Sequence, residues 1–137
     1  MPKLTKIELV RVHYVPKQMG LGVLYVSEEF GAAVHLCACG CGTKVSTPLG
    51  PAEWTLREME GGASLMPSVG NWQLPCKSHY WIRNGKVVWS DEWTRDQISA
   101  GQHEEEERRR RYYDALIRKR RGHLRRLWPW ILSLFRK

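Results

Sequence analysis

Four cysteines in two separate clusters constrain this chain more than any other feature of its sequence. Cys37, Cys39 and Cys41 occupy alternate positions, and Cys76 follows much later in the chain. Disulfides between cysteines two residues apart would close small, strained rings. Four thiolates are instead a ligand set that a structural zinc ion takes. The sequence therefore predicts one Zn²⁺ ion held by these four residues, in a small domain that the metal staples.

The predicted ligand set has one alternative. His35 precedes the first cluster and His79 follows the last cysteine, and either imidazole can replace one thiolate at zinc. If the chain from His35 to the end of the first cluster is an extended strand, His35 and three cysteines share one face, because side chains alternate. Gly40 and Gly42 would let the chain turn there so that several thiolates converge.

Short alternating segments separated by glycine and proline predict that most of the chain before residue 95 is β-structure. Asn84-Gly85, between two β-branched and aromatic runs, is typical of a two-residue hairpin turn. Pro67–Trp72 is predicted to be a loop. The expected fold class is mainly β (α+β overall), a small antiparallel β domain with a C-terminal helix. Other strands are expected over residues 4–14, 23–26, 32–37, 43–47, 54–59 and 63–66.

The C-terminal part of the chain differs in composition. Residues 108–137 hold twelve Lys and Arg and one acidic residue, so the formal charge of +8 originates there. Glu104–Glu107 stand four residues before Arg108–Arg111, which favours a helix through i,i+4 pairs. We predict two domains: a zinc-binding β-rich domain over residues 1–95, and a basic helical tail over residues 96–137 that ends in a short apolar segment.

Three roles are open for this tail. It can pack on the domain or on a second copy of the chain, or contact nucleic-acid phosphates. Its arginines, followed by Trp128, Trp130, Leu132 and Phe135, also suit an anionic membrane surface. Pro129 is expected to break or kink the helix, leaving an apolar end too short to span a bilayer. A cytoplasmic location is expected, because the start lacks an apolar signal segment and the thiols are predicted to be reduced.

A zinc ion on the cysteines would gather hydroxyls and imidazoles around it. Ser78 and His79 follow Cys76 closely, Ser68 precedes it, and His35 lies beside the first cluster. A serine hydroxyl next to an imidazole is the minimum for nucleophilic catalysis. Because neighbouring residues in a strand point to opposite faces, Ser68 with His79 or His35 is favoured over a Ser78–His79 pair. Each of these residues also has a structural interpretation, as a metal ligand, a partner of a ligand or a turn residue.

Three motifs in this order resemble those of a bacterial and phage domain family: His35-Leu-Cys-Ala-Cys-Gly-Cys-Gly42, Pro67-Ser-Val-Gly-Asn-Trp72 and Pro75-Cys-Lys-Ser-His-Tyr-Trp-Ile82. Members of that family are often encoded beside relatives of ubiquitin-activating and ubiquitin-conjugating enzymes and beside ubiquitin-like proteins. The resemblance covers roughly Lys6–Trp89. It implies a peptidase in a bacterial ubiquitin-like conjugation pathway, with zinc on the cysteines and with the two serines and two histidines above as catalytic candidates.

We therefore predict a zinc-binding, serine-type peptidase that processes a ubiquitin-like protein or removes it from conjugates. The alternative is a non-catalytic zinc module that contacts protein or nucleic acid, and a third option is a phage- or defence-associated adaptor anchored by its tail. The peptidase requires Ser68 Oγ within hydrogen-bond reach of His79 or His35. The binding module requires a groove lined by tryptophans, among them Trp54, Trp72, Trp81 and Trp89.

Overall fold

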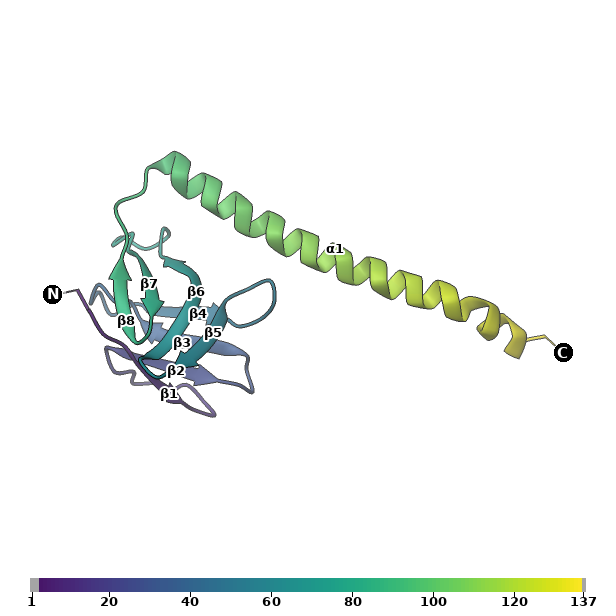
Figure 1. Cartoon of the computed structure of the whole chain (residues 1–137), viewed down its shortest axis with the longest axis horizontal. Coiled ribbons are helices and arrows are strands. Elements are labelled where there is room, and N and C mark those ends of the chain that lie inside the picture. The colour runs from purple at the N-terminus through teal and green to yellow at the C-terminus, as the bar shows by residue number, and fades with distance from the viewer. Residues whose placement is uncertain (1–2, 137) are drawn as a thin grey trace. The chain divides into compact units, whose positions relative to one another are not determined.

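The structure, a computed structural model, describes residues 3–136. Within them it contains eight strands followed by one long helix (Figure 1). The chain divides into two compact units, Met1–Thr94 with all the strands and Arg95–Lys137 with the helix. The elements are β1 Glu8–Arg11, β2 Val23–Ser27, β3 Ala32–Leu36, β4 Lys44–Pro48, β5 Thr55–Met59, β6 Gly62–Gly70, β7 His79–Arg83, β8 Lys86–Trp89 and α1 Arg95–Leu134.

The strands form two four-stranded sheets, ordered β1-β2-β3-β4 and β5-β6-β7-β8. The predicted fold class, mainly β with a C-terminal helix, is confirmed. One pair departs from the antiparallel expectation, because β1 and β2 run parallel. The segment between these two strands brings the chain back to the end of the sheet at which β1 begins, so that β2 can run in the same direction as β1.

The hairpin between β7 and β8 forms as predicted. Its turn residues, Asn84 and Gly85, have φ angles of 48° and 72°, and Asn-Gly is the pair that most readily adopts positive φ at both positions. The turn also joins other parts of the unit. Gly85 N donates to the Ala63 carbonyl at 2.9 Å, and its own carbonyl accepts from Ile7 N at 2.9 Å.

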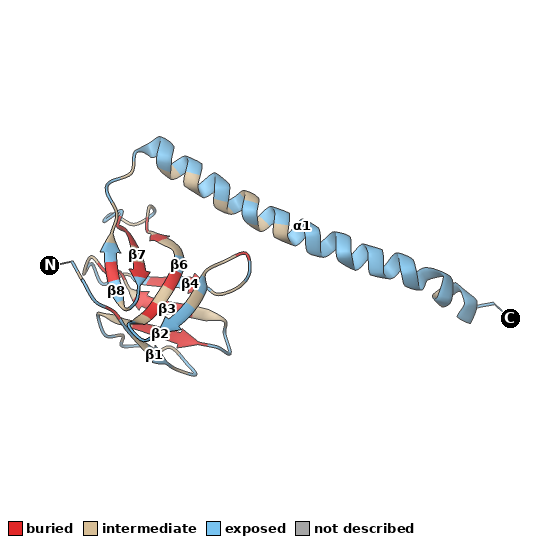
Figure 2. Ribbon diagram, viewed as in Figure 1, coloured by how far each residue is buried: buried red, intermediate tan, exposed pale blue. Residues whose placement is uncertain are grey.

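The hydrophobic core lies between the two sheets (Figure 2). Leu24 from β2, Leu65 from β6 and Tyr80 from β7 are fully buried members of one apolar cluster. Because strand side chains alternate between faces, the neighbours of Tyr80 on β7, His79 and Trp81, project to the opposite face of their sheet. That outer face carries the candidate site.

Strand β6 is longer than the sequence predicts. The prediction of a loop over Pro67–Trp72 is wrong for residues 67–70, because β6 continues to Gly70, and it holds for Asn71 and Trp72. Its register with β7 shifts between Leu65 and Val69, which is the signature of a β-bulge. The proline of this segment, which cannot donate to a ladder, falls in the irregular stretch while the flanking residues still pair. Ser68 therefore lies on a strand.

Helix α1 is one continuous element of 40 residues with none of them buried (Figure 2). The predicted break at Pro129 is wrong, because the helix runs through it to its end. The proline removes one backbone hydrogen bond from an exposed helix, while the turns on either side keep theirs. The expected i,i+4 pairs form, as between Arg111 and Glu107 at 3.2 Å. Within residues 3–136, no helix combines the length and apolarity that a bilayer crossing requires.

Candidate active site and metal centre

Ser68 and His79 meet on adjacent strands of the second sheet. Ser68 lies on the bulged part of β6, and His79 is the first residue of β7, opposite Gly70. The Oγ atom of Ser68 lies 2.8 Å from Nε2 of His79, a distance typical of the hydrogen bond between a hydroxyl nucleophile and its base. The two residues are eleven positions apart in the sequence, so the pairing of β6 with β7 brings them together.

Three tryptophans surround the imidazole of His79. The ring centroids of Trp72, Trp81 and Trp93 lie 4.7, 5.2 and 4.4 Å from that of His79. Trp72 and Trp93 also stack on each other, with centroids 5.4 Å apart. The exposed fraction of His79 is consequently only 4%. This burial lowers the pKa of His79 below its ordinary 6.5, so the ring is neutral at pH 7 and Nε2 can accept a proton.

The second ring nitrogen of His79 has a different environment. Among residues 3–136, no group is placed to hydrogen-bond to its buried Nδ1, whereas a serine-peptidase triad holds this nitrogen with a carboxylate. Packing against indoles orients the ring instead. From the sequence, Trp72 and Trp81 are expected only in the alternative binding surface, and Trp93 is not expected in either site. No local signal marks Trp93, because it lies beyond every motif and reaches His79 only through the fold.

Ser78 points away from His79 and towards the cysteines. Its Oγ lies 3.0 Å from Cys37 Sγ and accepts a hydrogen bond from Asn71 Nδ2 at 3.1 Å. With Asn71 donating to the oxygen, the Ser78 hydroxyl hydrogen is available to the Cys37 sulfur. The structure therefore does not bring Ser78 and His79 together as a pair, and Ser78 lines the cysteine cluster.

His35 lies in the core, on β3. Its Nε2 is 2.7 Å from the hydroxyl oxygen of Tyr80, and complete burial lowers the pKa of His35 to about 4. Tyr80 belongs to the core face of β7, opposite to the face that carries His79. The structure therefore separates His35 from the Ser68–His79 pair.

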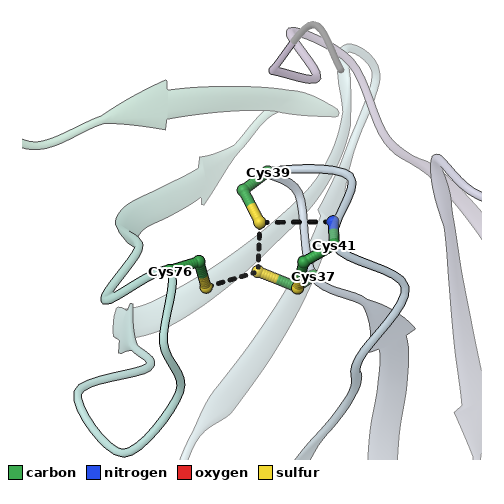
Figure 3. A group of neighbouring side chains, drawn as sticks. All are labelled: Cys37, Cys39, Cys41 and Cys76. Carbon is green, nitrogen blue, oxygen red and sulfur yellow. Dashed lines mark hydrogen bonds between the residues drawn. The ribbon is translucent and has the colours of Figure 1, made fainter.

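The four cysteines converge on one point (Figure 3). All four Sγ atoms lie within 4.8 Å of one another, and no histidine belongs to this group among the described residues. Cys37 Sγ is 3.4 Å from Cys39 Sγ and 3.8 Å from Cys76 Sγ. A tetrahedral zinc ion with Zn–S bonds of about 2.3 Å holds its sulfurs roughly 3.8 Å apart. The positions and chemistry of these sulfurs therefore fit a zinc ion.

The first three cysteines sit on a turn. Strand β3 ends at Leu36 and does not extend to Cys41, as alternation would require for a shared face with His35. Gly40 and Gly42 have φ angles of 88° and 80°, a conformation that glycine adopts without steric cost. The thiols therefore converge because the backbone turns around them.

The remaining cysteine lies in the loop that joins the two strands of the Ser68–His79 pair. Cys76 belongs to the β6–β7 loop, whose ends are closed by Asn71 N donating to the Ser78 carbonyl at 2.8 Å. A metal bound to all four cysteines would connect this loop to the turn after β3. It would thereby hold the start of β7, where His79 is located.

A family model for the bacterial ubiquitination-like system serine protease (BubE) matches residues 11–90. The chain belongs to this family. The match includes both cysteine segments and the Ser68–His79 pair, and it ends before Trp93 and α1. It confirms the resemblance drawn from the three motifs and the expectation of a serine-type peptidase. No curated protein and no solved structure shows significant similarity to the chain.

Membership of the BubE family places a requirement on the geometry, since a serine protease needs a serine hydroxyl beside a base. Within residues 11–90, Ser68 is the serine whose hydroxyl lies within hydrogen-bond distance of a histidine ring nitrogen. The hydroxyl of Ser27 is bonded to a backbone carbonyl, and that of Ser78 to the cysteine cluster.

Proposed function

We propose that this BubE-family chain hydrolyses peptide or isopeptide bonds with Ser68 as the nucleophile and His79 as its general base. The observation that supports this assignment is the 2.8 Å contact between Ser68 Oγ and His79 Nε2. The lowered pKa of His79 supports it further, because only a neutral imidazole can take the hydroxyl proton.

The reaction follows from this geometry. Ser68 Oγ attacks the scissile carbonyl while His79 Nε2 takes its proton and then gives it to the leaving amine. Water next attacks the acyl-enzyme, with His79 again as the base. The imidazolium that forms has no carboxylate at Nδ1 among residues 3–136. The indoles of Trp72 and Trp93, which pack edge-on to the imidazole, would keep the ring in place during this step.

The substrate that we propose is a ubiquitin-like protein, either as a precursor to be trimmed or attached to a target. The family description supports a role in a ubiquitination-like system. In precursor processing the leaving group is an α-amine, and in removal from a lysine it is an ε-amine. One Ser68–His79 pair can protonate either amine.

We further propose that Cys37, Cys39, Cys41 and Cys76 hold one Zn²⁺ ion with a structural role. Four thiolates complete a tetrahedron and leave no coordination position for water. Burial raises the pKa of the Cys37 thiol, and a bound cation reverses this effect by stabilising the thiolate. The ion would thus hold the β6–β7 loop in place, and the chemistry would remain with Ser68 and His79.

The test is to incubate the chain with a ubiquitin-like protein of a bacterial ubiquitination-like system, supplied both as a precursor and as a conjugate, and to follow cleavage by mass spectrometry. Ser68→Ala and His79→Ala are expected to lower kcat at least about 10³-fold. A fluorophosphonate, which acylates activated serines, should label Ser68, and peptide mapping identifies the site. Labelling of another serine, or cleavage by Ser68→Ala at the wild-type rate, would reject the assignment.

Two further variants separate the remaining catalytic candidates. His35→Ala removes the shorter of the two hydrogen bonds of the buried Tyr80 hydroxyl, which should cost about 1–3 kcal/mol of folding stability. Ser78→Ala should act on the cysteine cluster, since that is where its hydroxyl lies. If a well-folded form of either variant is no longer labelled by the fluorophosphonate, the substituted residue has a catalytic role.

A further inference from the structure

Two strand edges face a common groove beside Ser68. β5 begins at Thr55, opposite Met66, so within the described residues the last part of β6 has no strand paired on that side. β4 is the edge strand of the other sheet. The groove between these edges has a volume of about 140 Å³. Its walls come from residues 44–47 of β4, from Trp54, from residues 69–70 at the end of β6, and from Asn71, Gln73 and Leu74 in the loop that follows.

The β6 edge presents backbone groups to this groove. In an antiparallel ladder, pairs that bond to each other alternate with pairs whose N–H and C=O groups point outward. Asn71 N donates to the Ser78 carbonyl, so the next pair, Gly70 and His79, points outward. The His79 carbonyl accordingly accepts a bond from Ser90 N on the other side of β7. The N–H and C=O of Gly70 therefore point into the groove.

The β4 edge presents the complementary set. Cys37 N donates to the Thr43 carbonyl, and the ladder between β3 and β4 continues from this bonded pair. By the same alternation, the backbone N–H and C=O groups of Lys44 and Ser46 point away from β3. The Pro48 carbonyl, the next in this series, accepts a hydrogen bond from outside the ladder. Donors and acceptors on both walls are therefore available to an extended chain between them.

We infer that an extended segment of the polypeptide substrate binds in this groove as an added strand between β4 and β6, and that this segment carries small side chains. The inference rests on the proposed role of Ser68. Strand addition of this kind draws its affinity from main-chain hydrogen bonds. A groove of about 140 Å³ has the volume of about five water molecules, which suits a main chain with small side chains and excludes bulky ones.

The position of the groove connects it to the nucleophile. Ser68 directly precedes the wall residue Val69, and its carbonyl accepts a hydrogen bond at 3.4 Å from Nε1 of Trp54, another wall residue. A chain that pairs with Gly70 therefore lies beside the strand that carries Ser68, and it meets the Trp54 indole at the Ser68 carbonyl. The β-bulge matters here, since it ends the regular ladder immediately before the nucleophile.

Ser46→Pro tests the inference. Proline removes the outward N–H of residue 46 and places its ring in the groove, while the bonds from β4 to β3 stay intact. The matched variant Ser46→Ala removes the hydroxyl and keeps the N–H. We measure KM for the ubiquitin-like precursor and, separately, the rate at which a fluorophosphonate labels Ser68, because that small reagent needs no added strand. For Ser46→Pro, the rate of precursor cleavage should fall at least tenfold more than the rate at which the fluorophosphonate labels Ser68. Ser46→Ala should show no comparable fall in the rate of cleavage.

A second experiment varies the substrate and leaves the protein unchanged. Peptides that span the cleavage site carry single N-methyl groups, which remove one backbone donor each, or single small-to-leucine substitutions. Binding to the Ser68→Ala variant is measured by calorimetry, so the result does not depend on catalysis. At least one peptide with an N-methyl group, and at least one with a leucine substitution, should bind the Ser68→Ala variant at least tenfold more weakly than the unmodified peptide.

The outcomes separate this inference from the proposed function. If the fluorophosphonate does not label Ser68 in the wild-type chain, the proposed function is wrong, and the calorimetry still decides whether the groove binds a strand. If labelling succeeds but Ser46→Pro keeps the wild-type KM, and every N-methyl peptide binds equally well, the groove is not the substrate site.

Discussion

A Cβ atom on Gly70 would lie 2.6 Å from Nε1 of Trp72. The indole of Trp72 therefore rests directly on the backbone of β6, and from there it contacts the imidazole of His79. Any residue other than glycine would occupy the space of the indole. The orientation of the proposed base thus depends on a residue that has no side chain.

Gly70→Ala should displace Trp72 and loosen His79. We expect kcat/KM to fall by about 10²-fold, since small misplacements of a catalytic group have effects of that size. The matched control is Gly50→Ala, where the nearest atom to an added Cβ is Glu53 Cγ at 4.0 Å. Steady-state kinetics and thermal melts of both variants provide the measurement. Equal activity of the two variants would show that Trp72 does not position the base.

The pH dependence follows from the lowered pKa of His79. Catalysis needs the neutral ring, so activity should be full above the ordinary histidine pKa of 6.5 and should decline only at lower pH. The free energy of unfolding also falls at lower pH, because the unfolded chain binds a proton at His79 more readily than the folded chain does. The contribution of His79 is complete above pH 6.5 and is lost as pH falls through the folded pKa. A kcat/KM profile with its acid limb above 6.5 would contradict this prediction.

Trp93→Ala should move that acid limb. Removing this indole exposes His79 to water, which relieves the burial that lowers its pKa. The limb should therefore shift upward, towards 6.5. Trp128→Ala, which alters an exposed tryptophan of α1, is the control and should leave the profile in place. Identical profiles for the two variants would remove Trp93 from the site.

Ser78→Ala should weaken metal binding. The Ser78 hydroxyl lies 3.0 Å from Cys37 Sγ, and loss of a group that supports a ligand typically lowers metal affinity by about 10- to 100-fold. Elemental analysis should find one zinc per wild-type chain, and a chelator titration compares the affinities. Ser64→Ala, whose hydroxyl contacts Asn84 at a distance from the cysteines, is the matched control. Equal zinc retention by both variants would contradict the proposed role of Ser78.

Truncation after Glu107 should separate the tail from the folded unit. It removes residues 108–137, which carry twelve Lys and Arg. Because α1 has no buried residue, we expect an unchanged melting temperature for the β unit. Salt-sensitive binding to anionic vesicles or DNA should be present in the full chain and absent after truncation. Unchanged binding would reject both of these roles for the tail.

Local chemistry explains what could be read from the sequence. The closely spaced thiols of Cys37–Cys41 with Cys76 predicted one metal-binding cluster, because few other structures accommodate them, and the structure brings their sulfurs together. The hairpin at Asn84-Gly85 was predictable because positive φ is a property of the residues themselves. The loop expected at Pro67–Trp72 was wrong for residues 67–70 because a proline signals a local break, whereas a bulge lets the strand continue past it.

The sequence by itself determined the two cysteine segments, the β character and a set of two serines and two histidines. It favoured Ser68 over Ser78 but could not choose between His79 and His35, because both histidines lie near a cysteine segment. The tertiary structure decided among them: the register of β6 with β7 sets Ser68 against His79, and the β6–β7 loop, which ends at Ser78, carries the Ser78 hydroxyl to the sulfurs. The placement of Trp93 over His79 likewise arises only from the folded chain, since contacts between distant residues depend on packing and not on local preference.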